Sequence, residues 1–378
     1  MRQPGSHSWN RCWVMVVVLG LACGPGDTGE SAGSSTGDSS SASSEGSSGS
    51  SGATAGTATT TTTGPASGSE SASSTGDTTD ATATSDPTEG TSGTTEGTSG
   101  STGSTGGAQC MGGGLGPGDH NLEIVHGGRT RTLRLHIPPS YDGSEASPLV
   151  VNFHGLTSNV QEQVFFSGMN KTADAEDFMV AYPQGYMDSW NAGACCGGAE
   201  SAMIDDVGFV RALVETIEGV TCVDPARIFS TGMSNGGFMT HRLACEASDL
   251  FAAFAPVSSV LLAEPCEPQR SVPIMMFNGT SDTLVPYEGG LFIGAVETFE
   301  SWAEKSGCAG APVETFAEGA ATCQTYQECA DGAEVTLCTI DPMGHCWPGT
   351  AFCPFVPSNV DISANDEMWA FFEQHPMP

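Results

Sequence analysis

Apolar residues from about residue 130 onward fall into short runs separated by turn-forming residues. Several of these runs are continuously apolar, which is typical of strands that a sheet buries on both faces. Helix-like stretches lie between them. We expect strands at 130–137, 148–153, 178–182, 227–231, 251–257, 272–277 and 335–340, and helices near 160–176, 205–219, 235–247, 294–306 and 363–374. This alternation predicts an α/β fold with a mostly parallel central sheet and helices on both faces.

The start of the chain has the form of a secretory signal. Arg2 and Arg11 precede an eleven-residue apolar run, 12–22, which is too short to span a bilayer. Residues 1–22 are therefore predicted to be a signal peptide. Cys23 follows at the position of the modified cysteine in a bacterial lipoprotein signal, so we expect it to carry a lipid. Ordinary cleavage and free secretion is the alternative.

A long polar segment separates this signal from the apolar runs. Residues 23–109 are rich in Ser, Thr and Gly, and they include ten acidic residues, no Lys or Arg and no aromatic residue. Because such a segment cannot bury a core, we expect a disordered acidic tether, either bare or glycosylated. Residues 110–378 have the length of one catalytic domain, which completes a three-part organisation.

The charge and the cysteine content limit which ligands and partners the protein is expected to bind. A formal net charge of −33 disfavours nucleic acid and anionic lipid, and it suits a neutral or polymeric substrate. Twelve cysteines lie between Cys110 and Cys353 without a C-x-x-C pair or an H-E-x-x-H motif, so we expect disulfides, no metal and no cofactor. Adjacent Cys195 and Cys196 are expected to serve two different bridges, and Cys346 to fasten its loop to the core. We expect a monomer that meets a membrane only through an N-terminal lipid.

The sharpest motif is Gly232-Met233-Ser234-Asn235-Gly236, between a strand-like and a helix-like run. A Gly-x-Ser-x-Gly sequence in this setting is typical of the nucleophile elbow of α/β-hydrolases. The turn is so tight that glycine is needed on both sides of the serine. Ser234 is therefore predicted to be a catalytic nucleophile. A small-residue turn that happens to contain serine is the alternative.

A nucleophilic serine needs a base and an orienting acid, which follow it along such chains in the order Asp or Glu, then His. Three histidines follow Ser234. His241 is expected to point away along the elbow helix, and His375 to end the last helix, which leaves His345 in a Gly/Pro-rich loop beyond a strand. Asp282 lies just past the strand 272–277 and is the predicted acid. Its rival Asp341 lies only four residues before His345, too close to reach the ring from the correct side.

An oxyanion hole needs backbone N–H donors aimed at the developing charge. The amide of Asn235, directly after the nucleophile, is one predicted donor. The amide of Leu156 is the other, because the loop after strand 148–153 reads His154-Gly155-Leu156 and the glycine lets the backbone turn inward. His154 itself is expected to brace this loop. Trp190 and Trp347 flank these loops and are the predicted substrate contacts, with core packing as the alternative.

These pieces together resemble the polyhydroxybutyrate depolymerase-like and feruloyl esterase-like family of secreted serine esterases, which have the α/β-hydrolase fold. The resemblance covers about residues 120–376 and implies Ser234 as nucleophile, Asp282 as acid and His345 as base. The matching stretches are Phe153-His154-Gly155, Ser189-Trp190-Asn191 with Cys195-Cys196-Gly197, Ile204-Asp205-Asp206-Val207-Gly208-Phe209, Thr231 to Phe238, Gly279-Thr280-Ser281-Asp282 with Val285-Pro286-Tyr287, and Gly344-His345-Cys346-Trp347-Pro348-Gly349.

The sequence therefore predicts a serine carboxylic-ester hydrolase that is extracellular or at the cell surface, for instance as an outer-membrane lipoprotein. We expect a feruloyl or acetylxylan esterase that acts on plant polysaccharide esters. Depolymerisation of polyhydroxybutyrate is the alternative activity. An alternative of a different class is a non-catalytic surface binding protein on a hydrolase scaffold.

Overall fold

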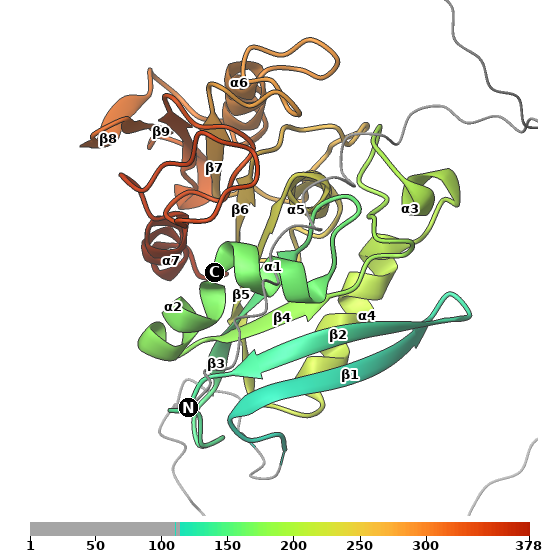
Figure 1. Ribbon diagram of the computed structural model, residues 1–378. Helices are drawn as coiled ribbons and strands as arrows, with labels where there is room; N and C mark the ends of the chain where they lie inside the picture. Colours follow the sequence, from blue (N-terminus) through green and yellow to red (C-terminus); the bar gives the residue numbers. More distant parts are fainter. Residues whose placement is uncertain (1–109, 111–113) are drawn as a thin grey trace, which may run out of the picture. The chain divides into compact units, whose positions relative to one another are not determined.

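A single mixed sheet organises the described part of the chain, which comprises residue 110 and residues 114–378 of this computed structural model (Figure 1). The predicted signal peptide (1–22), the predicted tether (23–109) and Cys23 lie outside the described residues. The strand order is β1-β2-β4-β3-β5-β6-β7-β10-β9-β8. The strands are β1 (Gly118–His126), β2 (Arg129–Ile137), β3 (Ser147–Phe153), β4 (Met179–Pro183), β5 (Val223–Met233), β6 (Ala253–Val257), β7 (Ile274–Gly279), β8 (Val313–Glu318), β9 (Ala321–Tyr326) and β10 (Val335–Ile340).

The centre of the sheet is parallel, from β4 through β3, β5, β6 and β7 to β10. At the two edges, β1 and β2 on one side and β9 and β8 on the other pair antiparallel. Successive residues of the central strands enter opposite core clusters; on β3, Leu149 and Val151 face one cluster and Val150 the other. Burial on both faces explains the continuously apolar runs, and the predicted fold class is confirmed.

Helices cover both faces of the sheet. The first core cluster takes residues of α4, α5 and α6, and the second takes residues of α1, α2 and α7 (Figure 1). The helices are α1 (Val160–Ser167), α2 (Met169–Glu176), α3 (Gly198–Ser201), α4 (Asp206–Glu218), α5 (Asn235–Glu246), α6 (Ala295–Lys305) and α7 (Ala364–Gln374). Within residues 114–378, no helix has the length and apolar character needed to cross a membrane.

Two expectations about these elements need correction. The single helix expected near 160–176 is two helices, because Gly168 adopts φ 58° and its amide caps α1 by bonding the Val164 carbonyl. Strands β1, β8 and β9 were not predicted. They lie toward the sheet edges. On β1 only Ile124 is buried, β8 has no buried residue, and the buried residues of β9 are the small side chains Ala321, Cys323 and Thr325, so none of the three forms an apolar run.

Six disulfides pair all the cysteines of the described part. Cys195 and Cys196 bond to each other, so the expectation of two separate bridges is wrong; their Cα atoms are 3.2 Å apart. Cys346 bonds Cys353, seven residues away, and therefore closes its own loop rather than fastening it to the core. The remaining pairs are Cys110–Cys222, Cys245–Cys266, Cys308–Cys329 and Cys323–Cys338.

Candidate active site

Ser234 occupies a strained turn between β5 and α5. Its φ of 58° and ψ of −123° lie outside the regions that non-glycine residues favour, a strain of roughly 1–3 kcal/mol. The flanking glycines are sterically required. A Cβ on Gly232 would lie 2.6 Å from the Gly236 carbonyl oxygen, and one on Gly236 would lie 2.2 Å from the Phe153 oxygen. The strand, turn and helix predicted from the motif are therefore present around a partly exposed serine.

Asp282 and His345 are directly paired. His345 Nδ1 lies 2.7 Å from Asp282 Oδ2, with the two side chains only 4% and 1% exposed. The other carboxylate oxygen, Oδ1, accepts hydrogen bonds from the amides of Leu284 and Val285 at 2.8 and 2.9 Å. The carboxylate is thus held on both sides, and it favours the tautomer in which Nδ1 carries the proton and Nε2 has a free lone pair.

The rival residues are engaged elsewhere. Asp341 accepts a hydrogen bond from Thr280 Oγ1. His241 is buried, and its Nδ1 accepts from the indole of Trp302 at 3.0 Å; burial lowers the pKa of His241 to about 3, so its ring is neutral near pH 7. His375 ends α7, with its Nδ1 2.8 Å from the Phe371 carbonyl oxygen.

The loop that carries His345 is hydrogen-bonded to the residue after β6, beside the turn of Ser234. The Ser234 amide donates to the Val257 carbonyl at the end of β6, at 3.0 Å. The next residue, Ser258, donates its hydroxyl hydrogen bond to the Cys346 carbonyl at 3.1 Å. Two hydrogen bonds around one strand end therefore link the turn of Ser234 to the loop of His345, although β7 separates β6 from β10 in the sheet.

The His154–Leu156 loop passes beside Ser234. A Cβ on Gly155 would lie 3.4 Å from Ser234 Cβ. His154 Nδ1 donates to the Gly155 carbonyl at 2.8 Å, and its Nε2 accepts from the Gly185 amide at 2.9 Å. Burial lowers the pKa of His154 to about 4, so the ring is neutral near pH 7 and braces the loop as expected. Within residues 114–378, the Leu156 and Asn235 amides donate to no protein acceptor.

The two predicted substrate contacts are corrected by their burial. Trp190 is fully buried, and its indole donates to the His154 carbonyl at 2.9 Å. Trp347 is 2% exposed, and its indole donates to Asn365 of α7 at 2.9 Å. Both side chains belong to the core, since neither presents a face that a ligand could touch.

Exposed aromatic rings near the histidine loop were missed. Phe352, inside the Cys346–Cys353 loop, is 51% exposed and lies 5.2 Å from the ring of Phe165, which is 62% exposed, and 5.8 Å from that of Phe166. The Phe165 and Phe166 pair on a predicted helix was the available sequence signal. We call these three residues the phenylalanine cluster; it joins α1, which follows the Leu156 loop, to the loop of His345.

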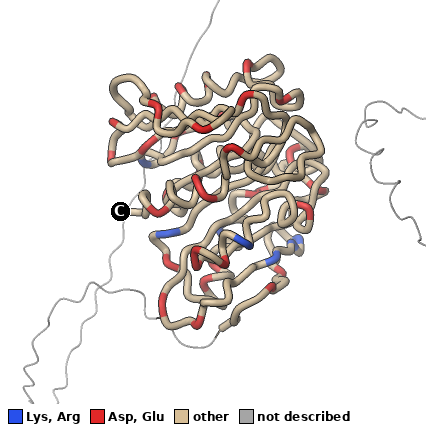
Figure 2. The backbone as a smooth tube through the Cα atoms, turned by 60° about the vertical axis from the view of Figure 1, so that its left-hand side comes forward, with Lys and Arg blue, Asp and Glu red and all other residues tan. Residues whose placement is uncertain are grey.

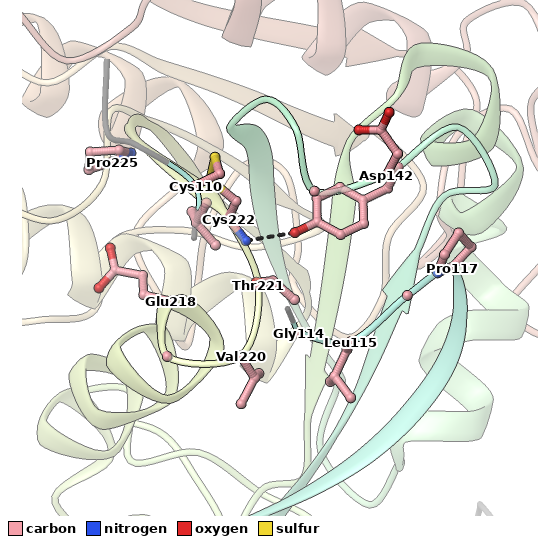
Figure 3. Close-up of a pocket in the computed structure, with 15 residues that line it drawn as sticks. Cys110, Gly114, Leu115, Pro117, Asp142, Glu218, Val220, Thr221, Cys222 and Pro225 are labelled. Carbon is pink, nitrogen blue, oxygen red and sulfur yellow. Dashed lines mark hydrogen bonds between the residues drawn. A yellow bond between two sulfur atoms is a disulfide. The ribbon is translucent and has the colours of Figure 1, made fainter. Parts of the chain in front are cut away.

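A pocket of about 630 Å³ lies elsewhere, around the Cys110–Cys222 bridge (Figure 3). Tyr141 accepts the Cys222 amide there at 2.7 Å. The residues that line the pocket include Val223 at the start of β5, whereas Ser234 follows the end of that strand. The pocket is therefore separate from the predicted site residues. The described residues form no cluster of three or more His, Cys, Asp or Glu side chains that could hold a metal ion.

The chain is similar to known esterases over much of its length. Residues 132–290 match the family model described as Esterase PHB depolymerase. Feruloyl esterase B of Piromyces equi is 34% identical over 234 residues, which cover 57% of this chain and only 42% of that protein. The putative esterase NocK of Nocardia uniformis subsp. tsuyamanensis is 32% identical over 263 residues, 63% of this chain and 76% of that protein. A solved acetyl xylan esterase from Aspergillus awamori is 16% identical, with 68% of this chain and 99% of that chain covered and a TM-score of 0.49.

Proposed function

Because this chain belongs to the Esterase PHB depolymerase family, we propose that it is a serine carboxylic-ester hydrolase acting on ester groups of plant polysaccharides. The observation that carries the proposal is the buried 2.7 Å pair of Asp282 and His345, whose loop is hydrogen-bonded to the strand end beside Ser234. A serine hydroxyl becomes a nucleophile when a paired imidazole lies within hydrogen-bonding reach of it, and in this proposal His345 is that imidazole.

In the proposed mechanism, Ser234 Oγ attacks the ester carbonyl carbon while His345 Nε2 takes the hydroxyl proton. Asp282 keeps the Nδ1 proton in place and stabilises the imidazolium that forms. The tetrahedral oxyanion accepts hydrogen bonds from the amides of Leu156 and Asn235. Collapse expels the alcohol, which receives the proton from His345. A water molecule, deprotonated by the same nitrogen, then attacks the acyl-enzyme, releases the carboxylic acid and restores Ser234.

Three observations support a neutral polysaccharide ester as substrate. The Piromyces equi relative is named a feruloyl esterase. Residues 110–378 hold nine basic against 34 acidic residues, and acidic positions recur throughout the described chain (Figure 2), so an anionic polymer would be repelled. The phenylalanine cluster provides apolar faces for sugar rings next to the histidine loop.

Hydrolysis of polyhydroxybutyrate is the second candidate. The family model carries the name of that depolymerase, and a cluster of three partly exposed phenyl rings also suits an aliphatic polyester. The alternative of a binding protein without activity predicts that Ser234 is unreactive toward a fluorophosphonate.

We also propose an extracellular or cell-surface location for the protein. Six disulfides in the described part require an oxidising compartment. Tethering through a lipid on Cys23 rests on the sequence pattern alone. Detergent phase partitioning and the mass of the mature N-terminal peptide test this proposal. A lipid-bearing protein should enter the detergent phase, whereas a protein that stays in water and lacks the acyl mass would favour free secretion.

The deciding experiment measures product release by the purified protein from feruloylated arabinoxylan, acetylated xylan and polyhydroxybutyrate film. Ser234→Ala is the control for contaminating activity. Ferulate or acetate released by the wild type alone is the expected result. Hydroxybutyrate as the sole product would show that the substrate is polyhydroxybutyrate and not a polysaccharide ester. Failure of the folded protein to react with a fluorophosphonate would refute the esterase proposal.

A further inference from the structure

The backbone of Trp190 is hydrogen-bonded to the side chain of Asn235, the residue that follows the proposed nucleophile. The Trp190 amide donates to Asn235 Oδ1 at 2.7 Å, and Asn235 Nδ2 donates back to the Trp190 carbonyl at 3.1 Å. Both residues are fully buried, so water does not compete for these bonds. This two-bond pairing fixes the first residue of α5, whose own backbone amide is one of the two proposed oxyanion donors.

The side chain of the same tryptophan holds the other donor loop. Its Nε1 donates to the His154 carbonyl at 2.9 Å, two residues before Leu156. The indole also packs edge-on against Phe153 and at a tilt of 46° against the His154 ring, each at a centroid distance of 5.1 Å. One residue therefore contacts both segments that carry the proposed donors, through its backbone on one side and its indole on the other.

A buried ion pair holds Asn191, the residue that follows Trp190. Asp206 accepts the amide of Asn191, the next residue, at 2.8 Å through Oδ2, and its Oδ1 lies 2.9 Å from Arg131 Nη2. Asp206 is fully buried and Arg131 nearly so. The Asn191 carbonyl accepts from Arg242 Nη1 at 2.5 Å. With both backbone groups of Asn191 held, the backbone of Trp190 has little freedom to shift.

We propose that Trp190 is a positioning residue of the oxyanion hole, setting the Leu156 and Asn235 amides relative to each other and to Ser234. The inference rests on the proposed esterase function. Oxyanion donors work only when they lie within hydrogen-bonding distance of the oxygen in its transition-state position. A residue that is bonded to both donor segments and buried from substrate affects the transition state and leaves substrate binding unchanged.

The test is Trp190→Phe, which keeps an aromatic ring and removes the indole N–H. Trp302→Phe is the matched control, since Trp302 is also fully buried and donates its indole hydrogen bond to a buried acceptor, His241. On p-nitrophenyl acetate we expect Trp190→Phe to lower kcat by about 10- to 100-fold with KM within about twofold, because small misplacement of reacting groups costs rate at this scale. Trp302→Phe should keep kcat within about twofold.

A second readout separates positioning from general destabilisation. A boronic acid forms a tetrahedral adduct with the serine, so its Ki should rise by about the factor by which kcat falls. Asn235→Ala, which keeps the backbone amide and removes the pairing with Trp190, should behave like Trp190→Phe, and it decides the question if Trp190→Phe does not fold. Equal kinetics for Trp190→Phe and Trp302→Phe, or an unchanged boronate Ki, would overturn the inference while the esterase stands. A wild type that is inert to fluorophosphonate removes both proposals.

Discussion

Replacing Asp282 by Asn should almost abolish hydrolysis without disturbing the fold. The reason lies in the surroundings of the two carboxylate oxygens. Oδ1 accepts from two backbone amides, those of Leu284 and Val285, so this position needs an acceptor. The amide oxygen of an asparagine would take it, and the NH₂ group would then face His345 Nδ1 across the present 2.7 Å contact. The ring would have to accept there, which places its proton on Nε2.

A histidine with its proton on Nε2 cannot take a proton from Ser234. Loss of the correct tautomer in a serine-histidine-aspartate arrangement lowers kcat by about 10⁴, or about 5.5 kcal/mol of transition-state stabilisation. The side-chain volume and the two backbone hydrogen bonds persist. We therefore expect the melting temperature to change by only a few degrees.

The assay is kcat on p-nitrophenyl acetate together with the melting temperature of each variant. Asp341→Asn is the matched control, because Asp341 is close to His345 in sequence and pairs with Thr280 instead. It should retain kcat within about twofold. A loss of less than tenfold in Asp282→Asn, or an equal loss in Asp341→Asn, would refute the assignment of the acid.

Three further predictions concern the elbow, the brace and the phenylalanine cluster. Gly236→Ala should give no soluble enzyme on expression, because its Cβ would meet the Phe153 oxygen at 2.2 Å. Unfolded His154 binds a proton below about pH 6.5, but the folded protein does so only near pH 4. The contribution of His154 to the free energy of unfolding should therefore decrease by up to about 3 kcal/mol as the pH is lowered from 6.5 to 4. Urea titrations of the wild type and His154→Gln should show a difference in stability that changes by about this amount over that window. Phe352→Ala should lower kcat/KM on feruloylated arabinoxylan about tenfold and leave p-nitrophenyl acetate hydrolysis unchanged; equal losses on both substrates would contradict a polymer-binding role for the cluster.

The strongest sequence signals were local. Gly232 and Gly236 around Ser234 predicted a turn that only glycines allow, and the structure has that turn between β5 and α5. His345 and Asp282 could be selected because each follows an apolar run, and the ends of parallel strands meet at one edge of a sheet. Their pairing at 2.7 Å agrees with that reasoning, while their catalytic roles remain for the kinetic tests.

Neither the disulfide pairing nor the burial of the tryptophans could be read from the sequence. Nothing in the spacing of Cys195 and Cys196 distinguishes one mutual bridge from two separate ones, and Cys346 had several candidate partners. Trp190 and Trp347 looked like substrate contacts because they flank the predicted site. A tryptophan beside a catalytic loop in sequence can equally lie beneath it, and burial depends on elements far away along the chain.

The sequence by itself determined the α/β alternation and the strained serine turn, because each depends on residues within a few positions of one another. The candidate acid and base could be chosen because each directly follows an apolar strand-like run, which is also a local signal. Only the tertiary structure decided that Trp190 lies under the site, with Asn235 on its backbone and the His154 carbonyl on its indole. Those contacts join residues 36 and 45 positions apart. Only the packing of β3, α5 and the segment after β4 around one buried side chain brings them together.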